Sequence, residues 1–313
     1  KPLFNAEDIY YRDRIIDYFQ KSEEDRITIQ SKLRIIGNNR NISFYEFFSR
    51  LKEVKKESNI YHYIIDIAWI LGIAMLFINA AASVAIFVIN ISVSILLYYK
   101  RKSQIEAYYS ILNYVLRMLY CAKKLSVISM PIIKNELDDI KSIYGELSSF
   151  RRMSGIVLNP NGGSLLDIVL DYVRMLTHVD LIKFNRMLGT ITKKHDEILK
   201  LHKTIGFLDV MIAISSYREM CSKTGWCVPQ ITDDVSVSVS DIYHPMLDNP
   251  VYNSISTKGG ILVTGSNASG KSTFLKAVAI NAILAQTLAT VNASSYKAAC
   301  FKVMTSMALK DNL

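Results

Sequence analysis

The feature that most limits how this chain can fold is a long stretch without charge. Residues 67–99 are 33 consecutive positions that contain no Asp, Glu, Lys, Arg or His. A run of about 18 or more apolar residues is a candidate membrane span. As one straight helix this run would be about 50 Å long, which exceeds the hydrocarbon core of roughly 30 Å. The run therefore predicts either one tilted span or two short ones.

Charge at the two ends of the run favours two spans. Lysines cluster before it at positions 52–56, and residues 100–102 after it are all basic, whereas the expected turn at 79–82 is uncharged. By the positive-inside rule both ends then face the cytoplasm. We expect a transmembrane helical hairpin over 61–102, with residues 64–99 contacting membrane lipid, in a membrane protein whose flanking regions are cytoplasmic. The alternative is a buried helical hairpin in a soluble core, but such helices rarely run so long without charge.

The rest of the chain divides into three segments. Residues 1–60 have helical spacing and form a small N-terminal segment, and residues 103–228 are helical apart from a turn at 159–163, which suits a lever. From residue 229 valines alternate with serines, which predicts a strand. Residues 261–264 have the pattern of a buried parallel strand, and residues 300–304 are predicted to form another strand. The expected fold class is multidomain, α plus α/β, with a helical lever or core domain followed by the start of an α/β domain at 229–313.

One motif in the last segment carries chemistry. Residues 265–272 read Gly-Ser-Asn-Ala-Ser-Gly-Lys-Ser, which fits the P-loop pattern G-x-x-x-x-G-K-[ST], between an apolar run and an apolar helix. Backbone amides of such a loop and of the helix N-terminus bind phosphate oxygens. We expect Lys271 to reach the β- and γ-phosphates of ATP and Ser272 to ligate Mg²⁺. Gly265 and Gly270 let the backbone approach the anion closely.

Hydrolysis needs more than this loop. Phosphoryl transfer requires an acidic residue to hold the metal and a group to position the attacking water. After Ser272 the only acid is Asp311, which does not end an apolar strand, so the catalytic residues are unknown. Because the chain lacks an initiator Met and ends abruptly at Leu313, we expect a segment of a longer polypeptide, and ATPase activity of the complete protein. The alternative is a nucleotide-binding scaffold without turnover.

The P-loop and its surroundings resemble the MutS family. Residues 264–273 match the family's TG-x-N-x-x-GKST, and His244-Pro245 match its His-Pro just before the ATPase sheet. The resemblance covers about residues 160–313 and is strongest over 241–290. It implies an ABC-like ATPase domain that works as a dimer, in which each P-loop is completed by the other subunit and long helices carry the nucleotide state to a distant site.

The resemblance also implies roles for two further residues. Asn267 matches the family's P-loop asparagine near the phosphates, and Val251, after Pro250, falls where the family packs a hydrophobic residue on adenine. The expected nucleotide-binding residues are Gly265, Ser266, Asn267, Ala268, Ser269, Gly270, Lys271, Ser272, Thr273 and Val251.

These observations together predict a membrane-anchored MutS-like ATPase that binds ATP with Mg²⁺ and uses ATP-driven homodimerisation to move a helical lever. The net charge of +9 favours an anionic partner, and DNA is a candidate. Phe44-Tyr45-Glu46 matches the family's mismatch-reading Phe-x-Glu, but the segment is too small for that domain, so mismatch recognition is not expected. An ABC-transporter-like ATPase subunit is a further alternative, although two short spans are too few to line a pathway.

Two remaining sets of residues predict no site. The four cysteines form no C-x-x-C pair, which favours a reducing compartment over a disulfide framework. His195 and His202 lie seven residues apart and share a helix face, and without a third ligand we expect that face to be solvated.

Overall fold

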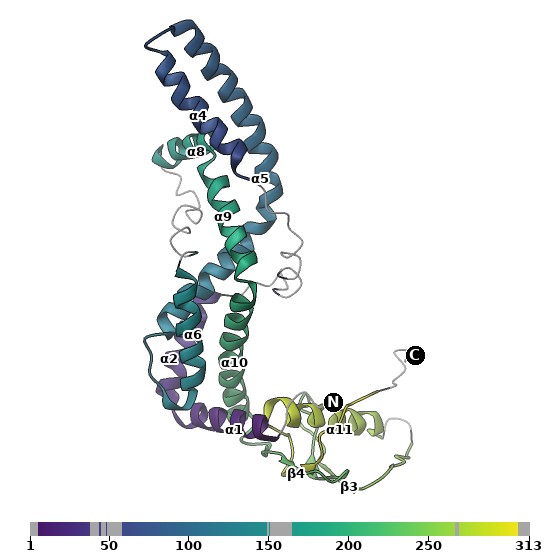
Figure 1. The fold of residues 1–313 in the computed structure, drawn as a ribbon. Coiled ribbons are helices and arrows are strands. Elements are labelled where there is room, and N and C mark those ends of the chain that lie inside the picture. The colour runs from purple at the N-terminus through teal and green to yellow at the C-terminus, as the bar shows by residue number, and fades with distance from the viewer. Residues whose placement is uncertain are drawn as a thin grey trace. The chain divides into compact units, whose positions relative to one another are not determined.

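The computed structural model describes residues 6–37, 44, 48, 58–148, 150, 165–266 and 269–305. Those residues are mostly helical with one small mixed sheet, which agrees with the expected α plus α/β class (Figure 1). The α-helices are α1 (Ala6–Lys21), α2 (Glu23–Leu33), α4 (Ile60–Met75), α5 (Ala80–Leu125), α6 (Lys134–Glu146), α8 (Leu165–Thr177), α9 (Val179–Lys193), α10 (His195–Met220) and α11 (Lys271–Leu288). The short 3₁₀ helices are η1 (Arg34–Ile36) and η3 (Pro131–Ile133), and the strands are β1 (Gln230–Ile231), β2 (Val237–Ile242), β3 (Asn253–Thr257) and β4 (Ser295–Ala298).

The chain forms two compact units that interleave along the sequence. The sheet unit comprises residues 1–30, 130–133 and 206–313, and the helical unit comprises residues 31–129 and 134–205. The four-segment division drawn from the sequence stays a prediction. Helix α5 passes through the expected boundary at 102 without a break, and the N-terminal helix α1 belongs to the same unit as the P-loop.

In the helical unit, α4 and α5 lie side by side and are joined by a short turn (Figure 1). The turn occupies residues 76–79. It ends at Asn79, whose side chain caps α5 by accepting a hydrogen bond from the Ala82 backbone N–H at 3.1 Å. The expected turn at 79–82 therefore lies about three residues too late. By length and apolar composition, Ala80–Lys102 is one candidate membrane span, whereas α4 is shorter, at 16 residues.

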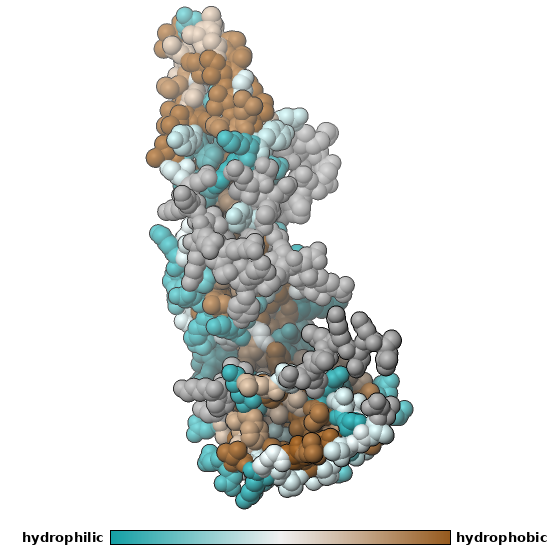
Figure 2. Space-filling view, turned by 90° about the vertical axis from the view of Figure 1, so that its right-hand side faces the viewer, coloured by the Kyte–Doolittle hydropathy of each residue, from teal (hydrophilic) through white to brown (hydrophobic). Residues whose placement is uncertain are grey.

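This helix pair turns its polar side chains inward. Ser83 Oγ donates to the Gly72 carbonyl at 2.7 Å and Asn90 Nδ2 donates to the Ile65 carbonyl at 3.2 Å, and both polar side chains are buried. Only 17% of the Ala80–Lys102 stretch is buried. Figure 2 shows the resulting hydrophobic surface, bordered by hydrophilic residues. The exposed apolar side chains of the pair include Ile67, Ile70, Leu71, Ile73, Val84, Val88, Ile89 and Leu96.

The junction between helices α8 and α9 is hydrogen-bonded to α4 and α5. The helical pattern breaks at His178, which has a left-handed backbone with φ 53°, and again at Lys194. His178 contacts His62 with 2.9 Å between their Nδ1 atoms, and its Nε2 donates to the Ser94 carbonyl at 3.0 Å. The indole of Trp69 donates to the Leu176 carbonyl at 3.0 Å. These bonds link α4, α5, α8 and α9 into one body.

The sheet has the strand order β1-β4-β2-β3. Strand β1 runs parallel to β4, whereas β2 is antiparallel to both β3 and β4, and Val239 faces Ile255 on one side and Tyr296 on the other. The valine and serine alternation therefore does form a strand, β2. Helix α11 packs on the sheet through Ala285, which lies in a core with Val239, Ile242, Val291 and Tyr296.

Two other strand predictions are wrong for the described residues. Residues 261–264 form no strand, and Leu262 is 87% exposed. Both edges of β2 and of β4 are already occupied, so this run could join the sheet only beside β1 or β3. Residues 300–304 are also not a strand; the neighbouring strand is β4, which ends at Ala298.

Candidate nucleotide-binding site

The described part of the P-loop is a turn that leads directly into helix α11. Gly270 precedes the helix with a left-handed backbone, φ 86°, a conformation that favours glycine. A Cβ atom at Gly265 would lie 2.9 Å from Ser269 Oγ, so a side chain there would force the Ser269 hydroxyl to move. Ser269 N–H donates to the Ser266 carbonyl at 3.3 Å. Asn267 and Ala268 lie outside the described residues.

Lys271 bends back over this loop. Its ammonium group donates to the Gly265 carbonyl at 2.6 Å and also to the Ser266 carbonyl. The side chain is thereby held on the loop side of the helix, where the sequence places the phosphates. An ammonium group has three donors, so it can exchange a loop carbonyl for a phosphate oxygen without a large movement.

The first turn of α11 provides the rest of the anion-binding geometry. Its first helical hydrogen bond runs from Phe274 N–H to the Gly270 carbonyl at 2.9 Å. The amides before it have no helical acceptor, and together with the helix dipole they favour negative charge at this end. The side chains of Ser272 and Thr273 are exposed at the same turn. A hydroxyl here is free to ligate a cation that accompanies a bound phosphate.

The other predicted residues are less closely tied to the loop. Val251 lies two residues before β3 and is 78% exposed, as stacking on a ligand ring requires. His244 Nδ1 accepts a hydrogen bond from Met246 N–H at 3.2 Å, which closes a turn around Pro245. Among the described residues, no group of three or more His, Cys, Asp or Glu side chains could hold a metal ion.

Buried polar residues that the sequence analysis did not single out support the site. Asn281, in the middle of α11, donates to the Tyr243 carbonyl at 3.0 Å and accepts from Asn292 N–H at 2.7 Å. Asn292 Nδ2 donates to the Tyr243 hydroxyl at 2.9 Å, and Asn292 Oδ1 accepts from Tyr217 at 2.9 Å. Burial raises the pKa of Tyr217 above its ordinary value, so this hydroxyl stays a donor at neutral pH. The network joins α10 and α11 to the residue that precedes His244. The sequence signal that could have revealed this network is Asn281, an asparagine inside an otherwise apolar helix.

The first residue of the Phe-x-Glu match, Phe44, packs inside the helical unit. Phe44 stacks on the His202 ring at 4.0 Å and on Phe48 at 4.7 Å, whereas Tyr45 and Glu46 lie outside the described residues. His195 stacks on Phe48 at 4.4 Å, and its side chain is only 12% exposed. The expectation of a solvated histidine face is therefore wrong, because both rings pack against phenylalanines that are distant in sequence.

Comparison with known proteins points to one family by name. No family model matches the chain. A DNA mismatch repair protein MutS from Leptospira interrogans is 31% identical over 157 residues, covering 46% of this chain and 18% of the relative. MutS from Methanosarcina barkeri is 31% identical over 120 residues, covering 36% of this chain and 13% of the relative, and human MutS protein homolog 4 is 28% identical over 122 residues, covering 36% and 12%. The chain thus spans less than a fifth of the length of these relatives, and over about half of its own length it is similar to MutS proteins.

Proposed function

We propose that this chain is the nucleotide-binding part of a membrane-anchored, MutS-like ATPase. The observation that carries the proposal is the loop of residues 265–270, which opens helix α11 with Lys271 held over the loop carbonyls. In this arrangement the loop amides and Lys271 bind the phosphates of ATP, and Ser272 ligates the accompanying Mg²⁺. The similarity to MutS proteins supports ATP over other phosphate-bearing ligands.

The anchor is the pair α4 and α5. In water a helix pair buries its apolar side chains, but here buried Ser83 and Asn90 satisfy backbone carbonyls of α4 while Ile70, Leu71 and Ile89 are exposed. That distribution fits a hydrocarbon environment, where polar groups must find partners within the protein. The basic residues 100–102 at the end of the apolar stretch fit a cytoplasmic boundary. Both ends of the hairpin then lie on the cytoplasmic side.

ATP binding at two such loops would bring two copies of the chain together and move the helices attached to them. We propose DNA as a candidate partner on two grounds, the net charge of +9 and the mismatch repair names of the relatives. Mismatch reading is not part of the proposal, since Phe44 packs against His202 and Phe48.

The decisive experiment measures MgATP binding by the detergent-solubilised chain and by its Lys271→Ala variant. We expect at least a hundredfold loss of affinity in the variant, because the ammonium group contacts two phosphates. Lys276→Ala is the matched control, because Lys276 is an exposed lysine of the same helix that lies one turn beyond the loop. Equal affinities of Lys271→Ala and the unaltered chain would refute the nucleotide site.

A second measurement tests turnover and its partner in the complete protein. ATP hydrolysis is compared with and without duplex, mismatched and branched DNA, always beside Lys271→Ala. Stimulation by DNA that is lost in the variant would support a DNA-remodelling role. Turnover that ignores DNA would direct the search to a membrane or protein partner, and Lys271-dependent binding without turnover would favour the nucleotide-binding scaffold.

A further inference from the structure

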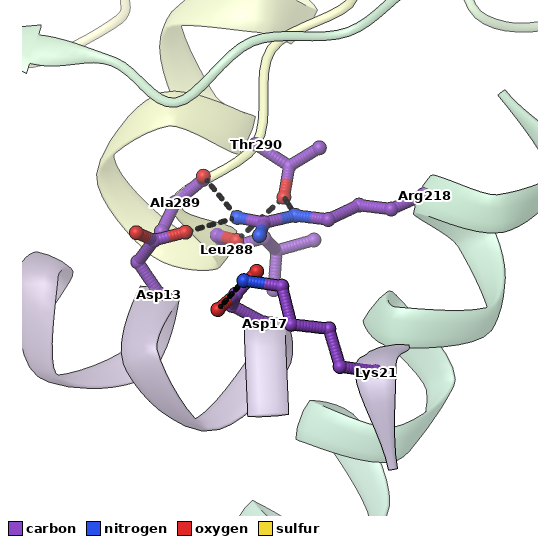
Figure 3. Close-up of polar contacts among 7 residues, drawn as sticks. All are labelled: Asp13, Asp17, Lys21, Arg218, Leu288, Ala289 and Thr290. Carbon is purple, nitrogen blue, oxygen red and sulfur yellow. Dashed lines mark hydrogen bonds and ion pairs between the residues drawn. The ribbon is translucent and has the colours of Figure 1, made fainter. Parts of the chain in front are cut away.

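The end of helix α11 that lies away from the P-loop is held by side chains. A helix leaves its last four carbonyls without helical partners, and here the terminal residue Ala289 is buried with a left-handed backbone, φ 51°. Three consecutive carbonyls each accept a side-chain hydrogen bond. Thr287 O accepts from Arg12. Leu288 O accepts from Thr290 Oγ1 at 2.9 Å and Ala289 O from Arg218 Nη2 at 2.7 Å (Figure 3).

Arg218 is the centre of this arrangement. Its side chain is 1% exposed, and its Nη2 pairs with Asp13 Oδ1 of α1 at 2.7 Å. Its Nε donates to Thr290 Oγ1 at 2.9 Å, and the guanidinium carbon lies 4.3 Å from the centre of the Trp226 ring. Burial lowers the pKa of Arg218, and the neighbouring Asp13 opposes that effect. The planar, forked donor set of an arginine fits these partners together, which a lysine ammonium cannot reproduce.

Helix α11 is most buried in its C-terminal half, and nearer the loop Phe274 and Val278 also pack against the sheet core. Asn281, Ala285 and Gln286 are buried, whereas Ser272, Thr273 and Leu275 near the loop are exposed. An 18-residue helix is about 27 Å long. A tilt of about 5° about its C-terminal end would therefore move the loop end by about 2 Å. A misplacement of about 1 Å can cost a binding or catalytic site a hundredfold in efficiency. The contacts at the C-terminal end therefore contribute to where Lys271 lies.

We propose that Arg218, with Asp13 and Arg12 of helix α1, is a positioning element of the nucleotide site that sets the direction of α11 and so the affinity of the P-loop for MgATP. The inference rests on the proposed function, because it concerns the same loop. It assigns the N-terminal helix a part in nucleotide binding, although Arg12 and Thr287 are 275 residues apart in the sequence. Arg218 makes no hydrogen bond to the described residues of the loop, and it acts through the helix.

The test measures MgATP affinity by calorimetry at 15 °C with the complete chain in detergent, together with the thermal midpoint of each variant. Arg218→Met is expected to bind MgATP about tenfold more weakly, and Arg218→Lys, which keeps the charge, about threefold more weakly. Arg12→Gln and Asp13→Asn are milder changes that carry the test if Arg218→Met does not fold. Each is expected to weaken binding by about threefold.

A matched control separates positioning from general loss of stability. Leu208→Ala removes a buried side chain of α10 that makes no hydrogen bond, so it should lower the thermal midpoint and leave the MgATP affinity unchanged. Affinities of the folded Arg218 and Arg12 variants within twofold of the unaltered chain would overturn the inference and leave the proposed function intact. Absence of Lys271-dependent binding in the unaltered chain would overturn both.

Discussion

The helix pair α4 and α5 and the sheet unit distribute polar and apolar side chains in opposite ways. In the pair, Ser83 and Asn90 are buried while Ile70 and Ile89 are exposed. In the sheet unit, an apolar core with Val239, Ile242, Ala285 and Tyr296 at its centre is buried, beside a hydrogen-bonded network that includes Asn281 and Asn292. The buried charge of Arg218 in that unit is fully paired.

The difference is the one that the proposed membrane anchor predicts. Burial of apolar surface stabilises a fold only where the alternative is water. In hydrocarbon, apolar side chains gain little from burial, whereas every backbone carbonyl and polar side chain needs a partner within the protein. Ser83 and Asn90 supply such partners to α4, and the sheet unit follows the rule for water. The same kind of substitution should therefore have different effects in the helix pair and in the sheet unit.

The largest effect is expected from charges on the exposed face of the helix pair. In Ile70→Lys/Ile89→Lys, each lysine near the middle of a span costs about 2.5–3.5 kcal/mol of insertion free energy. The variant should be released from membranes by alkaline extraction. Tyr120→Lys/Val127→Lys is the control, with exposed positions beyond the apolar stretch, and it should stay with the membrane. Retention of the first variant would contradict the membrane anchor.

Next in size is the loss of a buried side chain in the sheet unit. Ile16→Ala empties a fully buried position of α1 and should lower the free energy of unfolding by about 2–5 kcal/mol. Ile70→Ala makes the same change at a position that is 66% exposed, and should alter it by less than about 0.5 kcal/mol. Urea unfolding in detergent, followed by Trp226 fluorescence for the sheet unit and by Trp69 fluorescence for the helix pair, measures each loss in the unit that carries the substitution. A similar loss of unfolding free energy in Ile16→Ala and Ile70→Ala would contradict the predicted difference between the two regions.

A smaller effect with opposite signs is expected at two helical glycines. A Cβ at Gly72 would lie 2.5 Å from the Phe87 ring, so Gly72→Ala should destabilise the helix pair by about 1–3 kcal/mol. Gly145 in α6 has open space around its Cα, and Gly145→Ala should stabilise the helix by about 0.5–1 kcal/mol. Thermal unfolding in detergent measures both. Fluorescence of Trp69, which stacks on Phe87, reports the first change directly. Equal stability of Gly72→Ala and the unaltered chain would mean that the two helices do not pack so closely.

The smallest effect concerns pH in the helical unit. Burial lowers the pKa of His202, which lies against Phe44 and within 3.1 Å of the Tyr114 hydroxyl. The unfolded chain, with a histidine pKa near 6.5, then binds a proton more readily than the folded one. The contribution of neutral His202 to folding stability is fully present above about pH 6.5, and it declines as the pH falls below that value. His202→Phe should flatten the loss of thermal stability between pH 7.5 and 5, and an unchanged slope would exclude His202 as its source.

Local patterns predicted the elements that depend on neighbouring residues. The glycine and lysine spacing of residues 265–271 placed a turn before a helix, and α11 begins at Lys271. The alternation around Val237 and Val239 placed a strand, and the break in the uncharged run lies close to Asn79. The unpaired segment at 261–264 was assigned to a strand because strand pairing depends on partners elsewhere in the chain.

The sequence by itself determined the P-loop motif, the helical character of most of the chain and the uncharged character of the apolar stretch, since each is a matter of local residue order. Only the tertiary structure decided that α1 belongs with the P-loop, that Arg218 and Asp13 meet across 205 residues, and that His195 and His202 pack on phenylalanines. The physical reason is that a buried charge or ring is stable only beside its partner, and that partner is chosen by packing in space.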